Sequence, residues 1–368
     1  MCFTGEVLFG IQDKNMGTGK ISWKKKILNS LTIRNELGRY LICEFYSTFI
    51  VSAFVHAAVA QDVVSRTGSG FNVALAAGMG VMFGIYSGFG VSGGHVNLAL
   101  SIGIAAIGIF PWRRIPLYFL AELAGGFAGA WVVYRVYEDA FDHFDGGMRQ
   151  AFGENGTAGI FATFPQPYLS VTTGFLEQVL NTALLLAVIG AMMDRRNNPP
   201  PLSFAPFFFG LIVFTILMSY GYNAGAPLNP SIDLSGRLLL AAMGYGKEVW
   251  TPGGVHWWWI PILGPAIGSA LGSWAYYLAI SIHHPPLDVK ENATDYNENI
   301  ELGNKDGMTN NHTAEQNGLT NSTTITLRRR SSDVDQENDI MDDMSRPLSV
   351  DALCHNSLQN DATNDIYL

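Results

Sequence analysis

Two short stretches of similar design decide the fold of this chain. Residues 92–99 are Ser-Gly-Gly-His-Val-Asn-Leu-Ala, and residues 225–231 are Gly-Ala-Pro-Leu-Asn-Pro-Ser. In both, an asparagine precedes an apolar run that is shorter than the roughly 20 residues of a membrane-crossing helix. Asparagine is a favoured N-cap, and Pro230 suits the first position of a helix. We therefore expect two re-entrant half-helices that begin at Asn97 and Asn229.

Six longer apolar segments surround the two short ones, and each is long enough to cross a hydrocarbon core. The whole-chain composition, 48% hydrophobic and 14% charged, averages this apolar middle with polar ends. The pattern predicts an all-α membrane protein with six transmembrane helices and two re-entrant half-helices. The six segments are residues 39–62, 71–92, 115–137, 172–193, 203–222 and 257–282.

Three regions follow from this pattern. We expect a cytoplasmic segment at residues 1–38, a channel domain at residues 39–282 and a disordered cytoplasmic tail at residues 283–368, whose composition is too polar to form a core. Basic residues precede the first span and lie in the loops after the second and fourth spans. Because basic loops stay on the cytoplasmic side, we expect both termini in the cytoplasm. We expect the protein to be a multi-pass protein of the plasma membrane. These basic residues include Arg34, Arg39, Arg113, Arg114, Arg195 and Arg196.

Two modification sites are candidates. Asn155 begins an Asn-Gly-Thr sequon in the long loop after the third span, which this orientation makes extracellular and open to glycosylation. In the tail, Ser331 and Ser332 follow three arginines and resemble a basophilic kinase site. A solvated charge run explains the arginines equally well.

The two halves of the channel domain, about residues 39–137 and 172–282, form an internal repeat joined by an extracellular loop. Residues 124–131 are Ala-Gly-Gly-Phe-Ala-Gly-Ala-Trp, and residues 267–274 are Ile-Gly-Ser-Ala-Leu-Gly-Ser-Trp. Small residues at this spacing let helices approach closely in lipid. Because each half has three spans, the halves insert with opposite topology and place functional elements at the midplane.

Intramembrane carboxylates are functional candidates by default. Glu44 in the first span and Glu177 in the fourth precede Asn97 and Asn229 by nearly equal distances along the chain. This symmetry favours a role in accepting hydrogen bonds from the re-entrant loops, with proton relay as the alternative. His95 either lines the pore or braces its loop.

The twin asparagine elements, together with Cys43-Glu44-Phe45 at the start of the first span, resemble the aquaporin superfamily over residues 35–282. The resemblance implies a passive pore in each subunit of a homotetramer, with the asparagine amides donating to solutes. The usual Asn-Pro-Ala triplets are replaced here by Asn97-Leu98-Ala99 and Asn229-Pro230-Ser231. Leu98 lacks the fixed φ of proline, so we expect a less rigid start to the first half-helix.

Within that superfamily the chain resembles the glycerol-conducting branch. Asp233 and Arg237 follow the second triplet as they do in that branch, and Pro261-Ile262 stand where water channels prefer aromatic residues. The resemblance implies that glycerol, water and urea are the solutes.

The chain departs from the family at the narrowest ring of the pore. There an arginine normally follows the second triplet, but this sequence has Ile232. The other ring positions fall on Ala77, Leu217 and Ala226, where glycerol channels usually carry two aromatic residues and a glycine. We therefore expect a wide, apolar ring, which favours permeability to many neutral solutes with weaker exclusion of cations.

Other classes of function stay open or are disfavoured. Inverted repeats with broken helices also serve secondary transporters, and an apolar ring is compatible with a non-conducting membrane scaffold. An enzyme is disfavoured because the sequence shows no nucleophile–base pair, and it offers no cofactor-binding, metal-binding or nucleic-acid-binding motif. The three cysteines, Cys2, Cys43 and Cys354, have no motif spacing.

Overall fold

The computed structural model describes residues 23–66 and 69–285 of the 368-residue chain. Of these, residues 23–66 and 69–282 belong to one compact unit. The tail serines Ser331 and Ser332 lie outside the described residues. Within the described part, every regular element is a helix.

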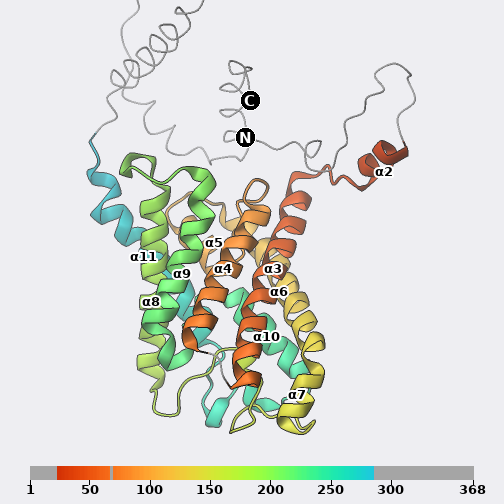
Figure 1. The fold of residues 1–368 in the computed structure, drawn as a ribbon. Helices are drawn as coiled ribbons and strands as arrows, with labels where there is room; N and C mark the ends of the chain where they lie inside the picture. Colours follow the sequence, from red (N-terminus) through yellow and green to blue (C-terminus); the bar gives the residue numbers. More distant parts are fainter. Residues whose placement is uncertain (1–22, 67–68, 286–368) are drawn as a thin grey trace, which may run out of the picture. The chain divides into compact units, whose positions relative to one another are not determined.

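Six long helices run side by side in this unit (Figure 1), one at each of the six predicted segments. Five are long and apolar enough to cross a membrane by length and composition. The sixth, α11, has 20 residues, but glycine, serine and an internal Pro265 dilute its apolar content. The six are α3 (Glu36–Ser65), α4 (Gly70–Gly88), α6 (Ile115–Val136), α8 (Val171–Met193), α9 (Ala205–Ala224) and α11 (Ile260–Ala279).

The two predicted half-helices are α5 (Leu98–Ala106) and α10 (Pro230–Ala242). At a rise of about 1.5 Å per residue, neither reaches across a hydrocarbon core of about 30 Å. The remaining α-helices among the described residues are α2 (Trp23–Leu31) and α7 (Glu138–Asp145). Short 3₁₀ helices occupy Trp112–Arg114, Ala158–Ile160, Arg195–Asn197, Leu202–Phe204, Lys247–Val249, Pro252–Gly254 and Ser281–His283.

Close glycine contacts reveal the internal repeat. Gly125 of α6 lies against the carbonyl oxygen of Phe45 in α3, and Gly268 of α11 lies against that of Val179 in α8, so closely that a Cβ would clash. The two halves therefore use the same helix contact, as the aligned small residues predict. One turn further along, the contact recurs between Gly129 and Phe49 and between Gly272 and Ala183.

The halves meet where α4 packs against α9. A Cβ on Gly78 would lie 2.7 Å from the carbonyl oxygen of Gly210, and a Cβ on Gly210 would meet the carbonyl oxygen of Gly78. Because each glycine contacts the other in the same way, the two halves are related by a local two-fold axis at this point. This is the arrangement expected of an inverted repeat.

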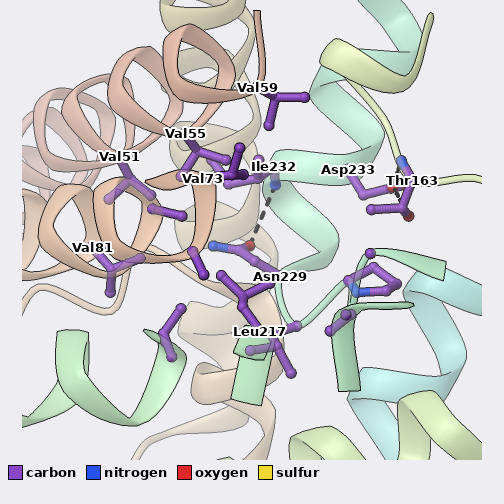
Figure 2. Close-up of a pocket in the computed structure, with 18 of the residues that line it drawn as sticks. Val51, Val55, Val59, Val73, Val81, Thr163, Leu217, Asn229, Ile232 and Asp233 are labelled. Carbon is purple, nitrogen blue, oxygen red and sulfur yellow. Dashed lines mark hydrogen bonds between the residues drawn. The ribbon is translucent and has the colours of Figure 1, made fainter. Parts of the chain in front are cut away.

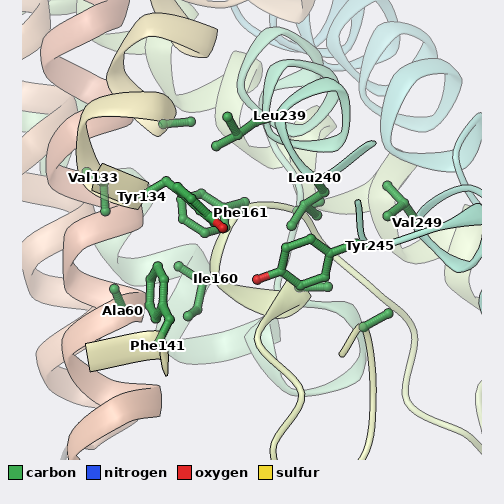
Figure 3. Packing of buried hydrophobic residues seen from close by; sticks show 14 residues of the cluster. Ala60, Val133, Tyr134, Phe141, Ile160, Phe161, Leu239, Leu240, Tyr245 and Val249 are labelled. Atoms are coloured by element: carbon green, nitrogen blue, oxygen red, sulfur yellow. The ribbon is translucent and has the colours of Figure 1, made fainter. Parts of the chain in front are cut away.

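A buried cluster anchors α10 from one side. Figure 3 shows Phe161 and Ile160 of the loop after α7 packed among Tyr134 of α6, Phe141 of α7 and Leu240 of α10. Phe161 and Leu240 are almost completely buried. The cluster therefore fixes the long third loop on the far end of the second half-helix and leaves its N-terminus free to face α5.

Candidate functional site

Asparagine side chains begin both half-helices, as the sequence predicts. Asn97 Oδ1 accepts a hydrogen bond of 2.9 Å from the Ala99 N–H. Asn229 Oδ1 accepts bonds of 3.0 and 3.3 Å from the N–H groups of Ser231 and Ile232. Such caps satisfy N–H groups that have no partner inside the helix. The acceptor oxygen of each amide is thus committed to its own helix.

The amide nitrogens cross to the opposite half. Asn97 Nδ2 donates to the carbonyl oxygen of Leu228 over 3.0 Å, and Asn229 Nδ2 donates to that of Val96 over 2.7 Å. Each Nδ2 carries two hydrogens, so one N–H of each amide is left over after this exchange. Both asparagines line the same cavity. The remaining donors of the two half-helices are therefore available to one lumen.

The cavity has a volume of about 670 Å³ and is bounded by α3, α4, α8, α9 and both re-entrant loops. Figure 2 shows Val51 and Val55 of α3 and Val81 of α4 pointing into the space beside Asn229 and Ile232. Of the described residues that line it, none is a lysine or arginine, and the titratable ones are His56, Asp62, His95, Tyr222 and Asp233. The wall is thus largely aliphatic, with a few polar groups.

All four predicted ring positions contribute to this wall. Ala77 of α4, Leu217 of α9, Ala226 of the second re-entrant loop and Ile232 of α10 line the cavity. Ile232 occupies the third position of α10, directly after Ser231. The structure therefore brings together four apolar side chains from four different elements.

Glu44 supports the first re-entrant loop. Its Oε1 accepts the His95 N–H over 3.0 Å and its Oε2 accepts the Val96 N–H over 2.8 Å. The Glu44 side chain is fully buried. The His95 ring shares a 2.7 Å hydrogen bond between Nδ1 and Ser101 Oγ. His95 both lines the cavity and braces its loop, so the two alternatives from the sequence are combined.

The second predicted support, Glu177, needs correction. Glu177 is only partly buried, and its Oε1 accepts a 3.1 Å bond from Asn223 at the end of α9. The repeat contact that pairs Phe45 with Val179 makes the preceding residues, Glu44 and Gln178, equivalent. Gln178 is fully buried. The repeat counterpart of Glu44 is therefore Gln178, one residue further along the chain than predicted.

Both re-entrant loops turn through left-handed backbone just before their asparagines. Gly93 and Gly94 have φ of 90° and 61°, and Gly225 and Ala226 have φ of 71° and 46°. Val96 also has a positive φ, 48°, which is unusual for a β-branched residue. Gly93, Gly94 and Gly225 signal this geometry in the sequence, but nothing there marks Val96 or Ala226.

The two markers of the glycerol-conducting branch form a buried ion pair. Arg237 Nε donates to Asp233 Oδ2 over 2.6 Å, and Asp233 Oδ1 accepts the Thr163 N–H over 2.8 Å. Arg237 also donates to the carbonyl oxygens of Thr163 and Val249. The pair therefore ties α10 to the loops on either side of it. Arg237 is fully buried and is not among the described residues that line the cavity.

Three other predicted residues lie away from the cavity wall. Pro261 is buried at the second position of α11, and Ile262 beside it is partly buried. Asn155 accepts a 3.0 Å bond from Arg66 through Oδ1. Thr157 of the same sequon is fully buried and hydrogen-bonds Tyr245 over 2.7 Å. Glycosylation of Asn155 would therefore have to precede the folding of this loop.

Glu122 has a structural role that no pattern in the sequence indicates. This fully buried carboxylate of α6 accepts a 2.6 Å hydrogen bond from Ser231 Oγ, and Ser231 Oγ accepts the Leu98 N–H over 3.1 Å. The three residues connect α5, α6 and α10 at the point where the half-helices meet.

Comparisons with known proteins agree with this arrangement. Residues 32–276 match the family described as Major intrinsic protein. The chain is 40% identical over 266 residues to aquaporin-9 of Homo sapiens, covering 72% of this chain and 90% of that protein. It is 38% identical over 262 residues to aquaporin-10 of Homo sapiens, covering 71% and 87%. The X-ray structure of the aquaglyceroporin from Plasmodium falciparum is similar with a TM-score of 0.59 and 31% identity, covering 67% of this chain and 97% of that chain.

Proposed function

The chain belongs to the major intrinsic protein family, and we propose that it is a passive membrane channel for glycerol, water and other small neutral solutes such as urea. The observation that carries this proposal is the pair of asparagine amides, from opposite halves of the chain, that line one cavity. Each amide keeps one N–H for a solute oxygen. Aliphatic side chains such as Val55 face the same space and suit the carbon backbone of a polyol.

Neutral solutes fit this lumen better than ions do. Asn97 and Asn229, the N-caps of α5 and α10, both line it, and the positive ends of the two helix dipoles oppose cations there. Anions find no lysine or arginine among the described residues of the wall. A neutral hydroxyl or amide can exchange hydrogen bonds with water for bonds with Asn97 and Asn229 at little net cost.

The solute range follows from the apolar ring of Ala77, Leu217, Ala226 and Ile232. Small side chains at two of the four positions favour a wide passage. An apolar ring supplies no hydrogen bonds to a solute that loses its water, and each unpaired polar group costs about 1–3 kcal/mol. In a wide ring a solute keeps part of its hydration, so we expect size rather than polarity to set the limit.

A direct test uses purified protein in proteoliposomes. Stopped-flow light scattering with water, glycerol, urea and longer polyols should show flux well above that of protein-free vesicles. A passive channel gives glycerol flux that rises linearly with concentration and is insensitive to ion gradients. Saturable, gradient-driven flux would instead indicate a secondary transporter. A complete absence of flux from correctly folded protein would favour the scaffold alternative.

Location and assembly are part of the same proposal. The basic loops after the second and fourth spans support cytoplasmic termini, in a homotetramer of the plasma membrane with one pore in each subunit. Asn155 then lies outside the cell. An Asn155→Gln variant should remove any mobility shift caused by N-glycosidase treatment, whereas a shift that persists in the variant would contradict this site. Cross-linking in native membranes should yield a species of four subunits.

A further inference from the structure

The two half-helices differ at their first residue. In α10 this position holds Pro230, which has no N–H to satisfy. In α5 it holds Leu98, which keeps its N–H. An N–H in the first turn of a helix has no partner within that helix. The leucine in the first signature triplet therefore adds a donor, at the junction of the half-helices, that a proline would not have.

Ser231 accepts this additional hydrogen bond. Its Oγ lies 3.1 Å from the Leu98 nitrogen, and the serine is fully buried. Ser231 is itself a departure, because it stands where the resemblance to the family leads one to expect alanine, which has no hydroxyl. The two departures from the signature triplets, one in each half of the chain, are thus in direct contact.

The Ser231 hydroxyl also needs an acceptor for its own hydrogen, because its oxygen already accepts the Leu98 N–H. Glu122 provides the acceptor: its Oε2 lies 2.6 Å from Ser231 Oγ. Hydrogen bonds to a charged or strongly polar acceptor are the short and strong ones. With Glu122 as the acceptor, the donors run from Leu98 N–H to Ser231 Oγ and from Ser231 O–H to Glu122 Oε2.

We propose that Leu98 and Ser231 compensate for each other, and that Ser231 and Glu122 are positioning residues that hold the N-terminus of α5 against α10. Without the fixed φ of a proline, the start of α5 is held by a hydrogen bond across the junction instead. That bond sets the place of Asn97, which directly precedes Leu98 and faces the lumen. The consequence for solute flux rests on the proposed channel function, but the hydrogen-bond coupling does not.

The coupling predicts unequal effects of one substitution in two backgrounds. Ser231→Ala leaves a buried N–H at Leu98 without a partner, and an unsatisfied buried donor is costly. In a Leu98→Pro background that N–H no longer exists, so the same Ser231→Ala change should cost less. A double-mutant cycle isolates this pairwise term.

The experiment compares wild type, Ser231→Ala, Leu98→Pro and the double variant as purified full-length proteins. Ser231→Ala should lower the midpoint of thermal unfolding by about 2–4 °C or more and reduce glycerol permeability severalfold in proteoliposomes. In the Leu98→Pro background both effects should fall to less than half. Equal effects in the two backgrounds would overturn the proposal. Coupling in unfolding without any glycerol flux would reject the proposed function and leave the hydrogen-bond chain standing.

Ser235→Ala is the matched control on the same helix. Ser235 is also fully buried, but its hydroxyl donates to the Ile232 carbonyl oxygen within α10. Its effect should therefore be the same in both backgrounds. If Ser231→Ala does not fold, the pair Ser231→Thr and Ser231→Val replaces it, since the two side chains have nearly the same shape. Threonine should keep stability and flux and valine should lose both, whereas equal behaviour would refute the role of the hydroxyl.

Discussion

Asn229 donates its side-chain N–H to the carbonyl oxygen of Val96 over 2.7 Å, from one half of the chain to the other. The bond holds the cap of α10 on the re-entrant loop that precedes α5. Val96 in turn is held by Glu44 through its own N–H. The orientation of the second pore asparagine thus depends on a carboxylate in the first span, far away in sequence.

Asn229→Ala removes three hydrogen bonds and the lumen-facing N–H. Loss of the cap alone costs about 1 kcal/mol, and the donor to solute is worth a further ~0.5–1.5 kcal/mol. We expect lower glycerol permeability per channel, with a larger loss in the Asn97→Ala/Asn229→Ala double variant. Permeability should be normalised to the protein incorporated. Asn223→Ala is the control, because the Asn223 side chain donates to Glu177 and does not line the cavity. Unchanged glycerol flux in the double variant would show that the two asparagines do not act in the pore.

Glu44→Gln tests the support of the first loop. Glu44 accepts two backbone N–H groups, and a glutamine replaces one acceptor oxygen by a donor that faces one of them. A buried N–H without a partner costs about 1–3 kcal/mol, so thermal stability in detergent and glycerol flux should both fall. Glu177→Gln should have little effect, since Glu177 is partly exposed. A loss of similar size in Glu177→Gln would restore the symmetric role expected from the sequence.

The difference between these two glutamates shows where prediction from sequence succeeds and fails. The asparagine caps and the six spans could be predicted, because they depend on run length and on local backbone chemistry. The choice between Glu177 and Gln178 depends on which face of α8 is buried. One residue on a helix rotates the side chain by about 100°, and spacing along the chain does not fix that angle.

Glu122 illustrates a second limit. Symmetry between the halves helps to locate Asn97, Asn229 and Glu44, but Glu122 has no carboxylate counterpart in the other half. Its partner, Ser231, lies in a different half and is reached only when α6 packs against α10. The hydrogen bond between Glu122 and Ser231 depends on tertiary packing, which cannot be predicted from a local sequence pattern.

Ala226→Gly should stabilise the second re-entrant loop. Ala226 has φ of 46°, and a left-handed conformation costs a residue with a Cβ about 1–2 kcal/mol. Glycine removes this strain but loses more entropy on folding, about 0.5–1 kcal/mol. We expect a net gain between about 0 and 1.5 kcal/mol, measured as a higher midpoint of thermal unfolding. Ala224→Gly, two residues earlier at the helical end of α9, should instead destabilise the protein. If both variants destabilise, strain at Ala226 does not limit stability.

Ile232→Arg places a cation in a wall that has no lysine or arginine among its described residues. A unit charge about 4 Å from a passing cation opposes it by about 1 kcal/mol in water and about 4 kcal/mol at an effective dielectric constant of about 20. Proton and cation leak should therefore fall by roughly five- to several-hundred-fold, since ~1.4 kcal/mol is a factor of ten. The longer side chain should also exclude the larger polyols and slow glycerol, while water flow persists.

The neutral variant Ile232→Met separates width from charge, because methionine is long and flexible but uncharged. It should narrow the range of polyols without changing cation leak, as measured by pH-sensitive dye and by stopped-flow scattering in the same vesicles. If Met and Arg reduce leak equally, the missing charge does not explain the leak. If the wild type passes water but rejects glycerol and urea, the apolar lining rather than the width of the ring decides which solutes cross.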